Sequence, residues 1–282
     1  MKLTFGQKSL DLENRTAVCG VLNITPDSFS DGGRFFDVPS ACSRALMMER
    51  EGADLIDVGA ESTRPGAAPV PAAEEIRRLV PVLKELKKKL HIPLSADTYK
   101  PETAKAALDE GADIINDITG LREENGMAQL ISRHGAGVII MHMQGSPADM
   151  QANPVYTDTV GEVEEFLRRQ AQKAVSAGIP PSSIAIDPGI GFGKKTEDNL
   201  KLINSLGRLS SLGFPVFIGL SRKSVIGDIL RLPVHERIEG AAALTACSIL
   251  RGANIVRVHD VKYMRRSAMM ADAVKFRGGK PA

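Results

Sequence analysis

Eight short runs of Val, Ile, Leu and Ala are spread along the chain, and polar residues follow most of them directly. Apolar runs of this length are typical of strands buried on both faces, as in a parallel sheet. Because parallel strands end at the same edge, their terminal polar groups would gather at one end of one sheet. These groups are Asn23, Glu61, Thr63, Asp97, Asn116, Asp117, His142, Asp187, Ser221, Arg222, Lys223, Arg257 and His259.

The segments between the runs have helical periodicity and end in a repeated pattern. Residues 51–57 (EGADLID) recur as 110–116 (EGADIIN) and as 251–257 (RGANIVR), which indicates a helix, a Gly stop and a buried strand. Repetition of this unit predicts a single α/β domain over 1–282, an eight-stranded (β/α)8 TIM barrel. Expected helices cover 39–50, 72–90 (with Pro81 inside), 101–110, 126–133, 162–177, 197–212 (capped by Thr196), 236–250 and 263–276.

The two ends of the chain do not follow this rhythm. Residues 1–15 contain two short runs around the turn Gly6-Gln7-Lys8, which predicts a small hairpin ahead of the barrel, and 277–282 are expected to fray.

The alternative architecture is an open doubly wound sheet, which would need a Gly-rich turn after the first strand. That turn has no GxGxxG pattern, and residues 189–193 (GIGFG) have the wrong spacing for a dinucleotide.

Composition excludes several classes of partner. The net charge of +2 argues against a nucleic-acid or membrane-surface protein, and 4% aromatic residues without Trp argue against base stacking. The first residues contain no apolar run of signal-peptide length, and no apolar run in the chain is long enough to span a membrane. The three scattered cysteines have neither disulfide nor zinc-site spacing. We therefore expect a cytoplasmic enzyme with small-molecule substrates.

Basic residues after the last two runs predict an anion site. Ser221 and Lys223 open a helix, and Arg257 and His259 follow the eighth run. The loops after strands seven and eight are the usual phosphate site of such barrels. A solvated basic loop is the alternative.

Asp97, Asn116 and Asp187 suggest recognition of a flat, polar ring. Two carboxylates and an amide match the paired N–H groups of a pterin or purine edge. Each residue alone could instead cap a helix or pair with Lys. His142 follows an apolar run and is equally well explained as a catalyst or a packed structural residue. Asn23 could give an oxygen to Mg²⁺ or simply belong to a turn.

Two polar loops, residues 25–34 and 61–67, are candidates for mobile lids. They belong to a series of strings that occur in order along nearly the whole chain. The strings are 20–33 (GVLNITPDSFSDGG), 61–66 (ESTRPG), 116–118 (NDI), 141–145 (MHMQG), 187–194 (DPGIGFGK), 221–227 (SRKSVIG) and 257–261 (RVHDV). Together they resemble the dihydropteroate synthase family, the pterin-binding barrels of the folate pathway.

The resemblance implies a transferase that joins 6-hydroxymethyl-7,8-dihydropterin diphosphate to 4-aminobenzoate through a cationic pterin. It also implies Mg²⁺, sulfonamide inhibition and a homodimer, for which helices 236–250 and 263–276 would supply the contact. By the resemblance, Asp97, Asn116, Asp187 and Lys223 hold the pterin, and Asn23 (through Mg²⁺), Arg257 and His259 hold the diphosphate. The 4-aminobenzoate pocket would be Phe29, Thr63, Arg64, Pro65, Phe192 and Ser221, and the catalytic set Asp97, Lys223, Arg257 and His259.

Ala60, Tyr99 and residues 232–235 depart from the family pattern, and we assign no chemistry to them. Two other functions remain open. A corrinoid methyltransferase barrel that binds methyltetrahydrofolate would share the pterin-edge groups but needs no diphosphate clamp. A non-catalytic homologue would bind pterin without turnover, although the intact Asn23, Lys223, Arg257 and His259 argue against it.

Overall fold

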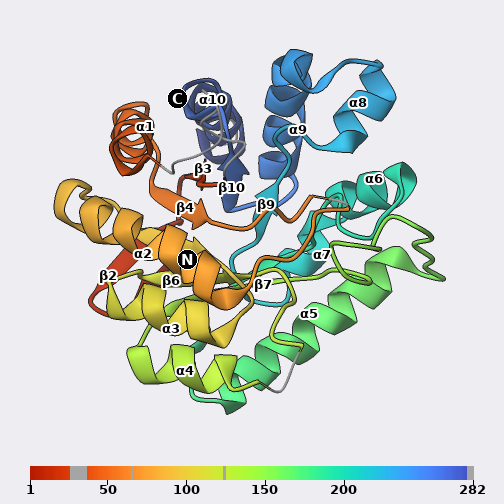
Figure 1. The fold of residues 1–282 in the computed structure, drawn as a ribbon. Helices are drawn as coiled ribbons and strands as arrows, with labels where there is room; N and C mark the ends of the chain where they lie inside the picture. Colours follow the sequence, from red (N-terminus) through yellow and green to blue (C-terminus); the bar gives the residue numbers. More distant parts are fainter. Residues whose placement is uncertain (26–36, 65, 123–124, 278–282) are drawn as a thin grey trace.

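The eight apolar runs form eight parallel strands that close into a barrel in the computed structural model (Figure 1). The structure describes residues 1–25, 37–64, 66–122 and 125–277. The strand order is β8-β7-β6-β5-β4-β3-β10-β9, and a parallel bridge between Ile186 and Val216 joins β8 to the β9 side. The predicted TIM barrel is thus confirmed. The strands are β3 (Ala17–Asn23), β4 (Leu55–Gly59), β5 (Leu94–Asp97), β6 (Ile114–Asp117), β7 (Gly137–Met141), β8 (Ile184–Asp187), β9 (Phe217–Gly219) and β10 (Ile255–Val258).

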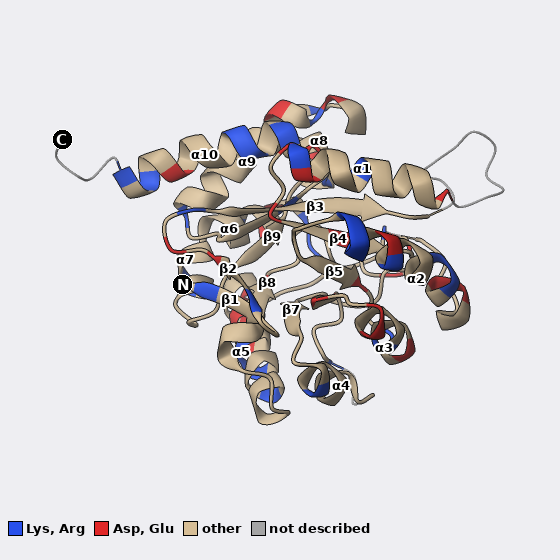
Figure 2. Ribbon diagram, turned by 90° about the vertical axis from the view of Figure 1, so that its left-hand side faces the viewer, with Lys and Arg blue, Asp and Glu red and all other residues tan. Residues whose placement is uncertain are grey.

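Helices surround the barrel, and they carry many of the charged side chains (Figure 2). None of the helices in the described ranges is long and apolar enough to cross a membrane. The α-helices are α1 (Val38–Arg50), α2 (Ala72–Lys89), α3 (Pro101–Asp109), α4 (Met127–His134), α5 (Thr159–Ser176), α6 (Thr196–Asn204), α7 (Leu206–Ser210), α8 (Ser224–Leu230), α9 (Ile238–Leu250) and α10 (Val261–Arg277). Two 3₁₀ turns, η2 (Pro181–Ser183) and η3 (Val234–Glu236), precede β8 and α9.

The prediction of a single helix over 197–212, capped by Thr196, is wrong in two details. It divides at Ser205 into α6 and α7, because the backbone of Ser205 (φ −106°, ψ 14°) leaves the helical region. Thr196 is the first residue of α6 and not its cap. Its hydroxyl donates to Asp228 on α8 over 2.5 Å, while the backbone N–H of Lys195 donates to Asp198. The remaining expected helices are present within a few residues, and α2 runs through Pro81.

The predicted hairpin closes the amino-terminal end of the barrel. Strands β1 (Lys2–Phe5) and β2 (Lys8–Asp11) pair antiparallel around Gly6, whose φ of 55° favours glycine at this turn. A TIM barrel is filled by layers of inward side chains, and the hairpin caps the lowest layer. The buried cluster consists of Leu3, Phe5, Leu10, Leu12, Ala17, Cys19, Leu55, Ile114, Ile139, Ala185, Phe217 and Ile255.

We expect Phe5→Ala to lower the free energy of unfolding by about 3–5 kcal/mol, because Phe5 is 2% exposed and its removal leaves a cavity under the barrel. Urea denaturation of the full chain would measure this change. Val155→Ala is the matched control, since Val155 is 60% exposed and its truncation should cost little. A loss below about 1 kcal/mol for Phe5→Ala would show that the hairpin does not support the barrel.

Candidate active site

Arg257 of β10 lies in a buried ion cluster inside the barrel mouth. Its Nε donates to Asp57 over 2.6 Å, and its Nη2 donates to Asp97 over 2.7 Å. Asn116 donates to the same Asp57 oxygen over 3.1 Å. Burial opposes the charge on the Arg257 guanidinium, but Asp57 and then Asp97 raise its pKa above the usual range. The cluster therefore keeps a permanent cation between two carboxylates.

Strand register explains why these residues meet. Arg257 pairs with Cys19 on β3, which stands four residues before Asn23, the residue that ends this strand. Arg257 therefore starts deep in the barrel, and its long side chain reaches up to Asp57 and Asp97. Asn23, Gly59, Asp97 and Asn116 form one row of paired residues across β3, β4, β5 and β6.

Asp57 was missed by the sequence reasoning, which looked for polar groups after strands and not within them. It stands in the middle of the apolar run of β4 and is 0% exposed. Leu55, two residues earlier, also points into the barrel, because alternate residues of a strand share a face. A carboxylate at an inward position of a barrel strand was the available signal.

Three buried polar atoms beside the cluster have no hydrogen-bond partner within the described part of the chain. They are Asp57 Oδ1, Asn116 Oδ1 and Ser95 Oγ. Buried polar groups are nearly always paired, and a ligand or a water molecule at this place would supply the missing partners. The amide oxygen of Asn116 accepts N–H groups, which fits the polar edge of a pterin.

The two predicted pterin carboxylates titrate close to neutrality. Burial, with the nearby Asp57 charge, raises the pKa of Asp97 to about 7 against the opposing effect of Arg257. Burial raises the pKa of Asp187 to about 6, although the carboxylate accepts the Gly189 N–H over 2.7 Å. N–H donors from a ligand would favour the charged form of both groups.

Lys223 and Phe192 meet at the same mouth. The Lys223 ammonium lies 3.9 Å from the centre of the Phe192 ring, a cation–π contact. Burial and the Arg257 charge lower the pKa of Lys223 to about 8. Gly191, with φ of 79°, leaves room for this contact, since a Cβ there would stand 3.2 Å from Lys223 Cδ. The glycines of 189–193 therefore serve a tight loop and not a dinucleotide.

His142 is a packed residue, which favours the structural alternative for it. Its Nδ1 lies 2.9 Å from the ammonium of Lys194, and Phe166 packs edge-on at 4.9 Å between ring centres. Burial and the Lys194 charge lower the pKa of His142 to about 2, so the ring is neutral at physiological pH. Lys194 also donates to the carbonyls of Gly189 and Phe192 over 3.0 Å. This pair, which sequence reasoning did not assign, fixes the loop that carries Phe192.

The loops after β9 and β10 come together as predicted. His259 Nδ1 and Ser221 Oγ lie 3.1 Å apart, and the His259 backbone N–H donates to the same hydroxyl. Burial, followed by the charges of Arg257, Arg222 and Lys223, lowers the pKa of His259 to about 3. The His259 ring is therefore neutral at physiological pH.

The other predicted residues lie around this mouth where the structure describes them. A Cβ atom on Gly59 would lie 3.7 Å from Asn23 Oδ1 and 3.5 Å from Asp97 Oδ2. Both oxygens therefore lie close to Gly59, on either side of it in the strand row. Thr63 is partly buried and Arg64 is exposed on the loop after β4. Gly66 donates to Pro147 over 3.1 Å, so this loop touches the loop after β7. Phe29 and Pro65 fall within the ranges that the structure does not describe.

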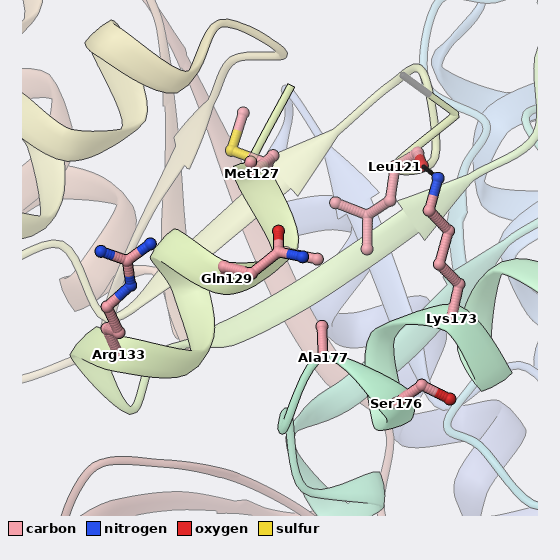
Figure 3. Close-up of a pocket in the computed structure, with 9 residues that line it drawn as sticks. Leu121, Met127, Gln129, Arg133, Lys173, Ser176 and Ala177 are labelled. Carbon is pink, nitrogen blue, oxygen red and sulfur yellow. Dashed lines mark hydrogen bonds between the residues drawn. The ribbon is translucent and has the colours of Figure 1, made fainter. Parts of the chain in front are cut away.

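A cavity of about 620 Å³ lies away from this mouth, between α4 and α5 (Figure 3). Leu121, Met127, Gln129, Arg133, Lys173, Ser176 and Ala177 are labelled around it. Lys173 donates to the Leu121 carbonyl over 3.2 Å, as the dashed line shows. The cavity belongs to the outer helical layer, and none of its described lining residues carries a carboxylate, so the barrel mouth is the better candidate for catalysis.

Comparison with known proteins identifies the family. The model of the pterin binding enzyme family matches residues 19–259. A dihydropteroate synthase from Synechocystis is 45% identical over 96% of this chain and 94% of its own length.

Solved structures agree. A Yersinia pestis dihydropteroate synthase with a sulfonamide drug complex has a TM-score of 0.92 at 40% identity, covering 98% of this chain and 99% of that one. The Xanthomonas albilineans dihydropteroate synthase with 4-aminobenzoic acid has a TM-score of 0.91 at 42% identity, covering 99% of both chains.

The chain belongs to the dihydropteroate synthase family. The relatives reported above match nearly the whole chain and are dihydropteroate synthases, which favours this function over the methyltransferase alternative. In this synthase-family barrel, the floor of the mouth is formed by the paired row from Asn23 to Asn116 and by the Arg257 cluster. Phe192, Lys223 and the Ser221–His259 contact form its rim.

We expect the affinity for 6-hydroxymethyl-7,8-dihydropterin to rise by roughly tenfold or more between pH 5.5 and 7.5. Below pH 6 the carboxyls of Asp97 and Asp187 hold protons, so they lack the negative charge that strengthens hydrogen bonds from the ring N–H groups. Above their pKa values the charged acceptors bind those groups. Calorimetric titration without the diphosphate avoids titration of the phosphate. Asp187→Asn should flatten the profile, Asp109→Asn on the outside of α3 should not, and a flat wild-type profile would contradict this assignment.

Proposed function

We propose that this chain condenses 6-hydroxymethyl-7,8-dihydropterin diphosphate with 4-aminobenzoate to give 7,8-dihydropteroate and pyrophosphate. The observation that carries the proposal is the buried cluster of Arg257, Asp57, Asp97 and Asn116 with its unpaired acceptor atoms. A flat ring with N–H groups along one edge would satisfy those acceptors. Sequence identity of 40–45% to dihydropteroate synthases over nearly the whole chain supports the same reaction.

The chemistry follows from the charges at the mouth. Departure of pyrophosphate breaks the bond between the exocyclic pterin carbon and oxygen, and the electron pair leaves with the phosphate. The resulting positive charge spreads over the ring, where Asp97 and Asp187 favour it. The amine of 4-aminobenzoate then forms the new C–N bond and loses a proton. Excluding water at this stage prevents hydrolysis of the cation.

The diphosphate would lie on the Arg257 and His259 side. Two nitrogens of Arg257 already bind Asp57 and Asp97, so Arg257 acts on the leaving group mainly through its charge. His259 is neutral and contributes a hydrogen bond. Lys223 adds a second cation close to both substrates.

A magnesium ion fits this arrangement if the substrate carries it. In the described ranges, no group of three or more His, Cys, Asp or Glu side chains is placed to hold a metal. Asn23 offers one amide oxygen beside Asp97, and Mg²⁺ commonly takes one or two protein oxygens with phosphate and water. Such an ion would neutralise charge on the departing pyrophosphate.

The amine substrate would bind above the pterin, against Phe192, Lys223 and Ser221, with Thr63 and Arg64 on the opposite loop. The resemblance also assigns Phe29 and Pro65, which lie outside the described residues, to this pocket. Sulfonamides, which resemble 4-aminobenzoate, would compete there. The three unpaired cysteines, two of them buried, support a reducing compartment such as the cytoplasm.

We expect the purified chain to release pyrophosphate when it is given dihydropterin diphosphate, Mg²⁺ and 4-aminobenzoate, with dihydropteroate as the product. Lys223→Met should lower kcat/KM by at least about a hundredfold, because it removes a cation that contacts the substrate pocket. Lys105→Met on the outside of α3 is the matched control and should retain activity. Tight pterin binding without product would instead support a non-catalytic homologue.

We further propose a homodimer formed through α9 and α10. These helices pack together with α8 on one side of the barrel (Figure 1), and large apolar side chains of α10 face outward. Met270 is 69% exposed, Met269 62% and Val274 60%. Exposed apolar residues gathered on one helix are typical of an interface.

Sedimentation velocity at micromolar concentration should show a dimer. Met270→Glu should weaken it by at least about tenfold in dissociation constant, because a charge would be buried against apolar groups. Val155→Glu, at an equally exposed site away from α10, should leave the assembly unchanged. A wild-type monomer would contradict the proposal.

A further inference from the structure

The loop after β4 is tied to the start of α3 by a compact polar network. Glu61, the first residue of the string ESTRPG, accepts a hydrogen bond from the Tyr99 hydroxyl over 2.8 Å. The Lys100 ammonium binds the other Glu61 oxygen and also binds Glu75 of α2 over 2.7 Å. Thr103 donates to the same Glu75 oxygen over 3.1 Å.

This network is shielded from solvent, so its contacts are not ordinary surface ion pairs. The side chains of Glu61, Glu75 and Lys100 are 5%, 1% and 16% exposed. The Lys100 ammonium also lies 4.6 Å from the centre of the Tyr99 ring. Burial and the Glu61 charge raise the pKa of Tyr99 to about 12, so its hydroxyl remains a donor. One cation thus joins two buried carboxylates from different elements.

The network connects the two halves of the proposed site. Asp97 lies two residues before Tyr99, and Thr63 and Arg64 lie two and three residues after Glu61. Tyr99 and Phe192 both pack against one buried apolar cluster, which consists of Ile118, Met141, Met143 and Met150. Tyr99 therefore contacts Glu61, which begins the loop of Thr63 and Arg64, and also the apolar cluster against which Phe192 packs.

We propose that Tyr99 and Lys100 are positioning residues that hold Glu61, and with it residues 62–64, where the amine substrate binds. Tyr99 thereby sets the affinity for 4-aminobenzoate without taking part in bond making. The inference rests on the proposed synthase function.

The test is steady-state kinetics of the full-length enzyme with both substrates varied. Tyr99→Phe keeps the ring and removes only the hydroxyl that binds the Glu61 carboxylate. We expect KM for 4-aminobenzoate to rise about tenfold, while kcat and KM for dihydropterin diphosphate change by less than about twofold. Ser211→Ala removes an exposed hydroxyl that donates to the Gly207 carbonyl on α7, away from the proposed site and from α10, and is the control.

A double-mutant cycle distinguishes positioning from general destabilisation. If Tyr99 acts through Glu61, then Tyr99→Phe in a Glu61→Gln background should change KM for 4-aminobenzoate little further. Lys100→Met should raise this KM more than Tyr99→Phe, because it leaves Glu61 and Glu75 buried without their cation.

An unchanged KM for 4-aminobenzoate in an active Tyr99→Phe enzyme would overturn this inference alone. Additive effects of Tyr99→Phe and Glu61→Gln would do the same. A fall in kcat together with similar rises in both KM values would also overturn it. If the wild-type enzyme makes no dihydropteroate, the proposed function fails and this inference fails with it. Wild-type turnover, measured in the same assay, therefore separates the two failures.

Discussion

The Arg257 guanidinium between Asp57 and Asp97 organises the whole mouth of the barrel. A buried carboxylate without a partner costs several kcal/mol, so Asp57 requires the cation and Arg257 requires its carboxylates. This mutual dependence aligns β4, β5 and β10 at their carboxyl ends and leaves acceptor oxygens without partners. The same interaction that orders the strands therefore leaves groups that a polar ring can satisfy.

The barrel separates stability from chemistry along its axis. Apolar side chains of the hairpin and the lowest interior layer fill the amino-terminal end. Charged and amide groups occupy the carboxyl end, where Asp57 stands two residues above Leu55 on the same inward face. Such a layered interior can hold buried charges at one end because the apolar layers below them stabilise the closed sheet.

The loops at the mouth depend on buried lysines of different kinds. Lys194 binds backbone carbonyls and the neutral ring of His142, which fixes the turn that carries Phe192. Lys100 binds two carboxylates and fixes the start of the loop that carries Thr63 and Arg64. Backbone and carboxylate anchors on opposite sides of the mouth would keep the amine pocket in place around a reactive cation.

Local sequence pattern was sufficient to predict the barrel, the hairpin, most helices and the polar residues at the ends of the strands. These features depend on periodicity and strand ends, which are readable one segment at a time. The division at Ser205, the cluster around Asp57 and the contacts of Tyr99 and Lys194 were not readable in this way. They arise from residues far apart in the chain that meet only when strand register and barrel closure place them. The sequence by itself determined which groups are available, and the tertiary structure decided which of them bind each other and which remain for substrate.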